Sequence, residues 1–429
     1  MKNISLFSIS MLVMTTLLAG CGHPPQTGNP SPSPSPSASA AVPPTTEPVE
    51  TPGKSPSPSP SPSDPVIDQL ASLTVNEKIG QLVIVGLEGT AMTAQTKTMI
   101  EKYHVGGFIL YKDNIADVPQ TISLLNALKK ANSASRAPLW LSVDQEGGKV
   151  NRMPDPIMNT PEAQQIGKAN DRSYTQQIGE AIGEELLALG FNMDFAPVLD
   201  INSNPDNPVI GSRSFGSDAQ KVTVHGLEMM EGIRSKQVAA VVKHFPGHGD
   251  TSVDSHLELP VVHKSLSELQ SFELQPFKEA VGQEADAIMI AHLLLPHIDK
   301  TYPASLSKEL ITGLLRDSLG YDGVVMTDDM TMGGIVKNFS IGNAAVRSVQ
   351  AGSDILLIGH DPKLQIAVLN ALRKAVEDQT ITEERLDQSV LRILRLKAKY
   401  GLKDSPAEQT DPAAINRIIE EALQTKTKS

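Results

Sequence analysis

Residues 243–256 place three histidines among acids and glycines in one short stretch, KHFPGHGDTSVDSH. The glycines permit sharp bends, so we expect a loop here, after the apolar residues 238–242. Asp254 lies two residues before His256, close enough for a carboxylate to meet an imidazole in a bent loop. Because an imidazole titrates near neutral pH and a carboxylate fixes its tautomer, the pair predicts proton transfer to and from a substrate. A polar surface loop with incidental histidines is the alternative.

A second acidic stretch follows the apolar residues 323–327, where Asp328 and Asp329 come next. Asp328 continues the apolar run without a break, so we expect its carboxylate at the mouth of the fold. A carboxylate in that place can act as a nucleophile. Asp329 is the candidate for capping a helix that follows.

Eight short apolar segments alternate with segments of helical spacing, and this alternation predicts the elements that position these residues. The apolar segments span residues 82–86, 107–111, 139–144, 193–199, 238–243, 287–291, 323–327 and 355–358. The helical segments include residues 118–131, 174–189, 222–235, 267–281, 308–318, 341–351 and 364–376. Nearly continuous Val, Ile and Leu indicate parallel strands that are covered on both faces. The pattern predicts a (β/α)8 TIM-type barrel, with a doubly wound open sheet as the alternative.

Polar residues at the ends of the predicted strands favour the barrel over the open sheet. They are Asp144, Asp200, Lys243, His244, His292 and Asp328. Barrels assemble their sites at the carboxyl ends of many strands, whereas an open sheet gathers ligands mainly at one switch point. We expect Asp200 and His292 to support the site without touching the substrate.

The amino terminus reads as an export signal followed by a tether. Residues 1–20 contain one lysine, an apolar segment and small residues, which predicts a signal peptide. Cys21, the only cysteine, follows Leu-Ala-Gly and resembles the lipidated cysteine of a bacterial lipobox. An ordinary cleaved signal or an uncleaved helix is the alternative. Residues 21–65 are rich in Pro and Ser and predict a disordered tether that holds the protein to a membrane.

The rest of the chain predicts a single catalytic domain over residues 66–400, opened by a capping box at Thr74. Residues 401–429 predict a surface helix and a tail. The net charge of -12 provides no basic field for nucleic acid, so we expect no polynucleotide partner.

A metal or nucleotide site is not supported by the sequence. His244, His248, Asp250 and His256 offer ligand atoms, but their spacing differs from a helical HExxH and no cysteine lies beside them. Neither GxGxxG nor GxxxxGKS/T occurs in a phosphate-binding context. We therefore expect no metal and no cofactor, and we expect His248 to shape the loop.

Five stretches together resemble glycoside hydrolase family 3, in its β-N-acetylglucosaminidase branch. They are residues 143–148, 196–200, 213–216, 243–256 and 327–330. Each stretch is short, but they occur in the family's order and the resemblance covers residues 66–400. It implies the same TIM-type barrel that the alternation predicts.

The resemblance also implies a role for each catalytic candidate. Asp328 matches the nucleophile, which forms a covalent glycosyl-enzyme and gives retention of configuration. His256 matches the acid/base, in place of the second carboxyl group of most retaining glycosidases. Asp254 matches the carboxylate that orients and charges this imidazole.

Four further residues match groups that hold the sugar. Asp144 resembles the acceptor for sugar hydroxyls, and Arg213, Lys243 and His244 resemble donors around the same ring. Since Lys243 and Arg213 are cationic, we also expect them to keep Asp144 and Asp328 ionised. A purely structural ion pair in the barrel mouth is the alternative for Arg213 and Asp144.

These inferences predict an exo-acting retaining β-N-acetylhexosaminidase that removes terminal N-acetylglucosamine from cell-wall (muropeptide) or chitin-type fragments. We expect a monomer anchored through the lipid on Cys21 at the extracytoplasmic face of the cell membrane. A β-N-acetylglucosaminide phosphorylase is one alternative, because an imidazole repels phosphate less than a carboxylate does. A sugar-binding lipoprotein without catalytic activity is the other.

Overall fold

The computed structural model describes residues 64–252 and 254–425, and a closed barrel of parallel strands lies at its centre. The strands follow one another around the barrel in chain order, and β8 pairs with β1. They are β1 Val83–Gly86, β2 Gly107–Leu110, β3 Trp140–Val143, β4 Met193–Asp194, β5 Ala239–Phe245, β6 Ala287–Ile290, β7 Val324–Asp329 and β8 Ile355–Ile358. The predicted (β/α)8 barrel is therefore confirmed.

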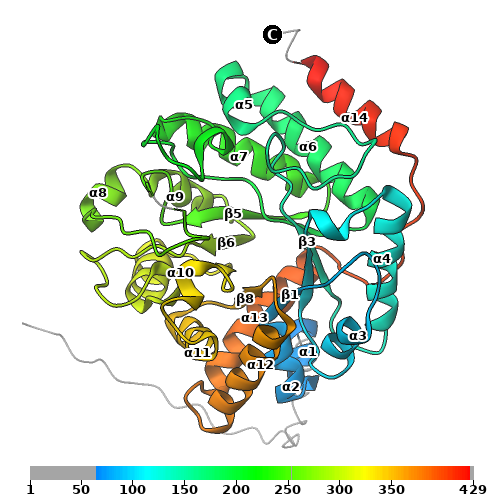
Figure 1. The fold of residues 1–429 in the computed structure, drawn as a ribbon, viewed down its shortest axis with the longest axis vertical. Coiled ribbons are helices and arrows are strands. Elements are labelled where there is room, and N and C mark those ends of the chain that lie inside the picture. The colour runs from blue at the N-terminus through cyan, green and yellow to red at the C-terminus, as the bar shows by residue number, and fades with distance from the viewer. Residues whose placement is uncertain (1–63, 253, 426–429) are drawn as a thin grey trace, which may run out of the picture. The chain divides into compact units, whose positions relative to one another are not determined.

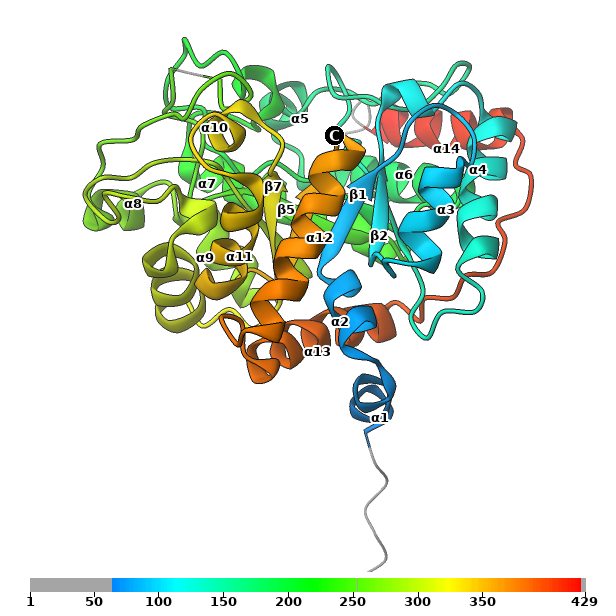
Figure 2. The ribbon, with the colours of Figure 1, turned by 60° about the horizontal axis from the view of Figure 1, so that its bottom comes forward.

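Helices surround the barrel, as Figures 1 and 2 show. They are α1 Pro65–Ser72, α2 Val75–Gln81, α3 Ala94–Glu101, α4 Val118–Ala131, α5 Ala163–Ala169, α6 Arg172–Leu189, α7 Ala219–Ser235, α8 Leu266–Ser271, α9 Gln275–Gly282, α10 Gly333–Val336, α11 Ile341–Ala351, α12 Pro362–Glu377, α13 Glu383–Lys399 and α14 Pro412–Thr425, with a π-helical segment at Glu309–Ser318. The predicted capping box forms at α2, where Thr74 and Glu77 exchange hydrogen bonds.

Buried aliphatic side chains fill the barrel and the layer between strands and helices. The residues of β1, β2, β3, β6 and β8 are all buried. This burial explains why those strands lack the alternation of polar and apolar residues that a half-exposed sheet shows. The core fixes the strands, so polar side chains at their carboxyl ends share one face of the barrel.

Three strands end two or more residues away from the predicted position. We expected β4 to run to residue 199, but it ends at Asp194 because Pro197 has no N–H to donate to a neighbouring strand. Beyond the end of β4, an isolated parallel bridge between Val198 and Lys243 continues the pairing of this segment with β5. Conversely, β5 runs on to Phe245 and β7 to Asp329, so their polar residues stand on strands and not on loops.

Asp329 does not cap the following helix, contrary to one expectation. Its Oδ1 accepts hydrogen bonds from the Thr331 amide (2.9 Å), the Thr331 hydroxyl (2.8 Å) and the Gly359 amide (3.0 Å). Helix α10 begins only at Gly333 and has Met332 as its N-cap residue. Asp329 therefore ties the end of β7 to the loop after β8.

The signal peptide, Cys21 and nearly all of the tether predicted over residues 21–65 lie outside the described residues. Within residues 64–252 and 254–425, no helix combines the length and the apolar character needed to cross a bilayer.

Candidate active site

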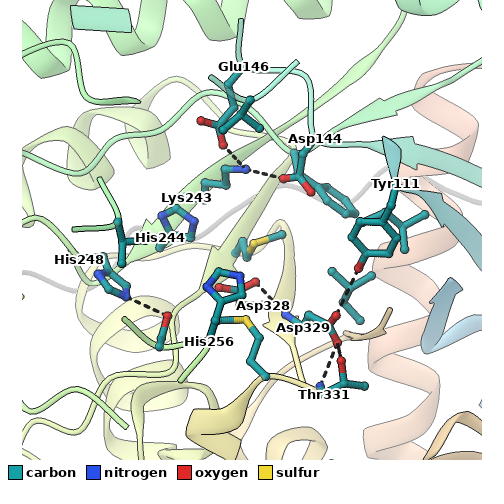
Figure 3. A pocket seen from close by; sticks show the side chains of 18 of the residues that line it. Tyr111, Asp144, Glu146, Lys243, His244, His248, His256, Asp328, Asp329 and Thr331 are labelled. Carbon is teal, nitrogen blue, oxygen red and sulfur yellow. Dashed lines mark hydrogen bonds and ion pairs between the residues drawn. The ribbon is translucent and has the colours of Figure 1, made fainter. Parts of the chain in front are cut away.

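A cavity of about 420 Å³ opens among the loops at the carboxyl ends of the strands (Figure 3). Six of the residues predicted to take part in catalysis or to hold the sugar line it, namely Asp144, Arg213, Lys243, His244, His256 and Asp328. Asp254 reaches this group through its contact with His256. The barrel thus brings together residues that are up to 184 positions apart in the chain (144 to 328).

Asp328 lies on β7, and its Oδ1 accepts a hydrogen bond of 2.8 Å from the Asp329 amide. Burial by itself would raise the pKa of Asp328, but nearby His244 and His292, together with that amide, hold it below its usual value. The carboxylate is therefore ionised at neutral pH. The expectation that Lys243 and Arg213 hold the charges of Asp144 and Asp328 names the wrong cations for Asp328, since both are bound to other carboxylates, but Lys243 does pair with Asp144.

His256 stands on the exposed part of the loop after β5, and its side chain is 64% exposed. The Asp254 Oδ1 accepts hydrogen bonds from both the backbone N–H of His256 and its ring Nδ1, each over 2.8 Å. Burial raises the pKa of Asp254, but these two hydrogen bonds outweigh it and keep the carboxyl ionised. Since Nδ1 is occupied, Nε2 is the ring nitrogen that can exchange a proton with a substrate.

Lys243 and Glu146 form the centre of a buried network of charges on the β3 and β5 side of the cavity. Lys243 Nζ lies 2.6 Å from Asp144 Oδ1 and 2.7 Å from Glu146 Oε1. Arg213 grips the same Glu146 with two parallel hydrogen bonds of 2.8 and 2.7 Å. Burial alone would raise the pKa of Glu146, yet Arg213 and Lys243 hold it far below its usual range. The network fixes Asp144 and Lys243 in place.

Asp200 lies behind the cavity and organises the start of the loop after β5. It is fully buried, and its Oδ2 lies 2.6 Å from His244 Nδ1. Its Oδ1 accepts a hydrogen bond of 2.6 Å from the His248 amide. Asp200 thus orients His244 without lining the cavity, which matches the supporting position expected from the sequence.

His292 also lies behind the cavity, as expected. Its Nε2 donates to the Asp329 carbonyl over 3.0 Å, and its Nδ1 lies 2.7 Å from the Ser305 hydroxyl. Burial lowers the pKa of His292 and so favours the neutral form of the ring. The residue therefore supports the end of β7.

His248 anchors the inside of the loop. Its Nδ1 lies 2.9 Å from the Thr251 hydroxyl and its Nε2 lies 3.1 Å from the Ser255 hydroxyl. Burial, with the neighbouring His244 as a second cause, lowers the pKa of His248 to about 4. A neutral, buried ring with both nitrogens occupied cannot act as an acid or base, and it shapes the loop as expected.

Several cavity residues were not proposed from the sequence as members of the site: Tyr111, Glu146, Arg152, Asp329 and His360. Tyr111 directly follows β2, and His360 comes two residues after the end of β8. The rule that barrel sites form at the carboxyl ends of strands could therefore have identified both. Their rings stack at 4.4 Å, and the Tyr111 hydroxyl donates to Asp329 over 3.2 Å. Arg152 lies in a long loop, where no periodic signal marks it.

No group of three or more His, Cys, Asp or Glu side chains arranged to hold a metal ion occurs within residues 64–252 and 254–425. The arrangement places an ionised carboxylate, an imidazole and side chains able to bind hydroxyl groups in one cavity.

A family model for the glycosyl hydrolase family 3 N terminal domain matches residues 74–396. The chain belongs to glycosyl hydrolase family 3. Members of this family are glycoside hydrolases, so the prediction that the chain is such an enzyme is confirmed. The family also accounts for the position of the cavity at the carboxyl ends of the strands.

Among similar family 3 proteins is the beta-hexosaminidase A of Pseudoalteromonas piscicida, 36% identical over 334 residues that cover 72% of this chain and 56% of that relative. The chain thus matches little more than half the length of this relative. The beta-hexosaminidase LpqI of Mycobacterium tuberculosis is 34% identical, with 76% of this chain and 84% of the relative covered.

A solved family 3 beta-N-acetylglucosaminidase from Paenibacillus sp. str. FPU-7 superposes with a TM-score of 0.78 at 41% identity, over 83% of this chain and 69% of that chain. A structure of the beta-glucoside phosphorylase BglX superposes with a TM-score of 0.74 at 26% identity, over 84% of this chain and 65% of that one. The shared barrel therefore occurs in proteins described as hydrolases and as a phosphorylase.

Proposed function

We propose that this family 3 protein is an exo-acting retaining β-N-acetylhexosaminidase that releases terminal N-acetylglucosamine. The observation that carries the proposal is the pairing, in one cavity, of an ionised carboxylate at Asp328 with His256, whose Nδ1 is held by Asp254. The relatives described as beta-hexosaminidases and as a beta-N-acetylglucosaminidase support the choice of sugar. Muropeptides of the cell wall and chitin fragments are the candidate natural substrates.

In the first step, an Asp328 oxygen attacks the anomeric carbon of the sugar. The bond between that carbon and the bridging oxygen breaks, and His256 donates its Nε2 proton to the leaving oxygen. The product is a covalent glycosyl-enzyme on Asp328. Asp254 stabilises the ring in its charged form before the transfer and fixes which nitrogen carries the mobile proton.

In the second step, the neutral His256 takes a proton from water. The resulting hydroxide attacks the anomeric carbon from the face that the leaving group vacated, and Asp328 departs as a carboxylate. Two inversions give net retention. Asp144, Lys243 and Arg213 line the same cavity and can bind sugar hydroxyls, since Asp144 accepts hydrogen bonds and the two cations donate them.

The test uses the purified protein with an aryl N-acetyl-β-glucosaminide. We expect sustained release of the phenol, and proton NMR of the first sugar product should show the β-anomer. A slow fluorinated donor should add one sugar mass to the peptide that contains Asp328. An initial α-anomer, or a label on another residue, would overturn the mechanism, and absence of turnover would favour a binding protein.

Phosphorolysis is the second candidate, because a neutral imidazole repels phosphate less than a carboxylate does and a phosphorylase shares the barrel. Phosphate would replace water in the second step and give a sugar 1-phosphate of retained configuration. Product analysis by mass spectrometry with and without phosphate distinguishes the two acceptors. We expect free sugar to dominate in both conditions.

We also propose that the protein is anchored to the extracytoplasmic face of the cell membrane through a lipid on Cys21. The signal-like residues 1–20 and the Leu-Ala-Gly-Cys sequence support this anchor. Expression in a bacterial host with a radioactive fatty acid should label the wild type and leave a Cys21→Ala variant unlabelled. Equal labelling of both proteins would exclude the anchor.

A further inference from the structure

The loop that carries His256 is bonded through its backbone to the segment that follows the two aspartates of β7. The Gly333 amide donates to the His256 carbonyl over 3.1 Å, and the Gly334 amide donates to the Ser255 carbonyl over 3.1 Å. The two segments meet at the cavity, which Ser255, His256 and Gly333 all line. These bonds connect the acid/base candidate to the strand of the nucleophile candidate.

A third bond comes from an exposed side chain. Lys337, directly after α10, extends its Nζ to within 2.7 Å of the Leu257 carbonyl. Three consecutive loop carbonyls, those of residues 255 to 257, therefore accept hydrogen bonds from residues 333 to 337. We call these three bonds the clamp.

The clamp leaves little room for a side chain at either glycine. A Cβ on Gly333 would lie 2.6 Å from the His256 and Leu257 carbonyl oxygens, closer than a Cβ and an oxygen approach in real proteins. A Cβ on Gly334 would lie 3.2 Å from the Ser255 oxygen and 3.3 Å from the Glu258 oxygen, so these neighbours would have to shift by a few tenths of an ångström. We therefore expect an alanine at 333 to displace the loop and an alanine at 334 to displace it less.

The donor side of the clamp is itself fixed to the barrel. Asp329 holds the intervening turn through its bonds to Thr331 and binds the Gly359 amide after β8. The Met332 amide donates to the Asp329 carbonyl over 3.0 Å. The clamp is thus a rigid extension of β7, and the loop is placed relative to it.

We propose that Gly333, Gly334 and Lys337 are positioning residues that set the distance between His256 and Asp328. This inference rests on the proposed function, in which His256 protonates the leaving oxygen. Proton transfer requires heavy atoms within about 3 Å, and a displacement of about 1 Å can reduce a rate 100-fold. The His256 side chain is mostly exposed and bonded to Asp254, so its position depends on the backbone of its loop, which the clamp holds together with the contact between His248 and Ser255.

The decisive measurement is kcat/KM on a series of N-acetyl-β-glucosaminides whose leaving groups range from acidic phenols to alkyl alcohols. This ratio reports the first step, where an acidic phenol departs without protonation and an alcohol needs the acid. Loss of acid catalysis steepens the dependence of rate on leaving-group pKa. General destabilisation of the fold lowers kcat/KM by the same factor for all substrates. The slope of log kcat/KM against leaving-group pKa then stays unchanged.

Lys337→Met keeps the aliphatic stem and removes one bond of the clamp. We expect it to lower kcat/KM about fivefold for the alkyl glycoside and less than about twofold for the most acidic phenol. Gly334→Ala should have a larger effect and Gly333→Ala the largest, about 100-fold on the alkyl glycoside. Lys130→Met, on the exposed surface of α4, is the matched control and should leave kcat/KM unchanged for both substrates.

His256→Ala separates this inference from the proposed function. If His256→Ala leaves the slope unchanged, both the acid role and the clamp proposal are wrong. If His256→Ala steepens the slope but Lys337→Met and Gly334→Ala do not, only the clamp proposal is wrong. Thermal unfolding of each variant identifies any that fail to fold. If a glycine variant does not fold, Lys337→Met, which changes an exposed side chain, tests the clamp proposal by itself.

Discussion

Two parts of the cavity wall differ in how firmly they are held. On one side, the side chains of Lys243 and Glu146 are only 1% and 5% exposed. Ion pairs among Asp144, Glu146, Arg213 and Lys243 hold these side chains in one arrangement. On the other side, His256 is 64% exposed and depends on Asp254 and on the backbone of its loop. The difference indicates that the groups we propose to bind the sugar are fixed before substrate arrives, whereas the proposed proton-transfer group is placed from outside the core.

Asp328→Ala should have the largest effect, because it removes the carboxylate that we propose as the nucleophile. We expect kcat to fall by about 10⁴-fold or more on every substrate, since no other group can form the covalent intermediate. Steady-state assays with activated and unactivated glycosides measure this. Asp322→Ala, an exposed acid before the same strand, is the control. Substantial remaining turnover would move the nucleophile to another residue.

His256→Ala should have the next largest effect, and a selective one. It should reduce kcat/KM by about 10² to 10⁴-fold for poor leaving groups and far less for acidic phenols. The pH profiles of the two proteins test the same point, because the limb that reports the acid should vanish in the variant. Equal losses on all substrates would contradict the division between a binding side and a proton-transfer side.

Glu146→Ala should weaken the fold more than any change in the exposed loop. It leaves buried Lys243 and Arg213 without a shared carboxylate, and an uncompensated buried charge costs roughly 3 kcal/mol of unfolding free energy. Urea denaturation measures this loss. Asp254→Ala is the contrasting variant, since it should slow catalysis with little change in stability. Similar unfolding free energies for the two variants would contradict the distinction between a firmly held ion-pair network and a loosely held loop.

The smallest effect concerns His248, the buried anchor of the loop. Its pKa of about 4 lies below the ordinary 6.5, so the unfolded chain binds this proton more readily. Its contribution to stability is therefore complete above pH 6.5 and lost as pH falls toward 4. Between pH 6.5 and 5, the unfolding free energy of the wild type should fall about 1.5 kcal/mol further than that of His248→Gln. Parallel curves would show that His248 titrates normally.

Sequence reasoning succeeded where a signal is local. Eight apolar runs alternating with helical segments predicted the barrel, because parallel strands covered on both faces are continuously apolar. The rule that barrel sites form at carboxyl strand ends predicted that Asp144, Lys243, His244 and Asp328 would meet. The spacing of Asp254 and His256 predicted their contact, which the structure contains.

Sequence reasoning failed where a partner is distant in the chain. Glu146 was quoted only as part of a motif, and nothing local indicates that Arg213 and Lys243 converge on it. For the same reason, Lys243 and Arg213 were assigned to Asp328 as well as to Asp144, whereas the charge of Asp328 is favoured by His244 and His292. No local pattern marks Gly333 and Gly334, whose amides contact the His256 loop only in the folded chain.

The sequence by itself determined the fold class, the family and which side chains stand at the strand ends, because periodicity and short motifs are properties of neighbouring residues. Only the tertiary structure decided which charges pair, which histidine is buried and neutral, and what holds His256 in place. Those properties depend on distances and burial between segments far apart in the chain, and closure of the barrel is the step that sets them.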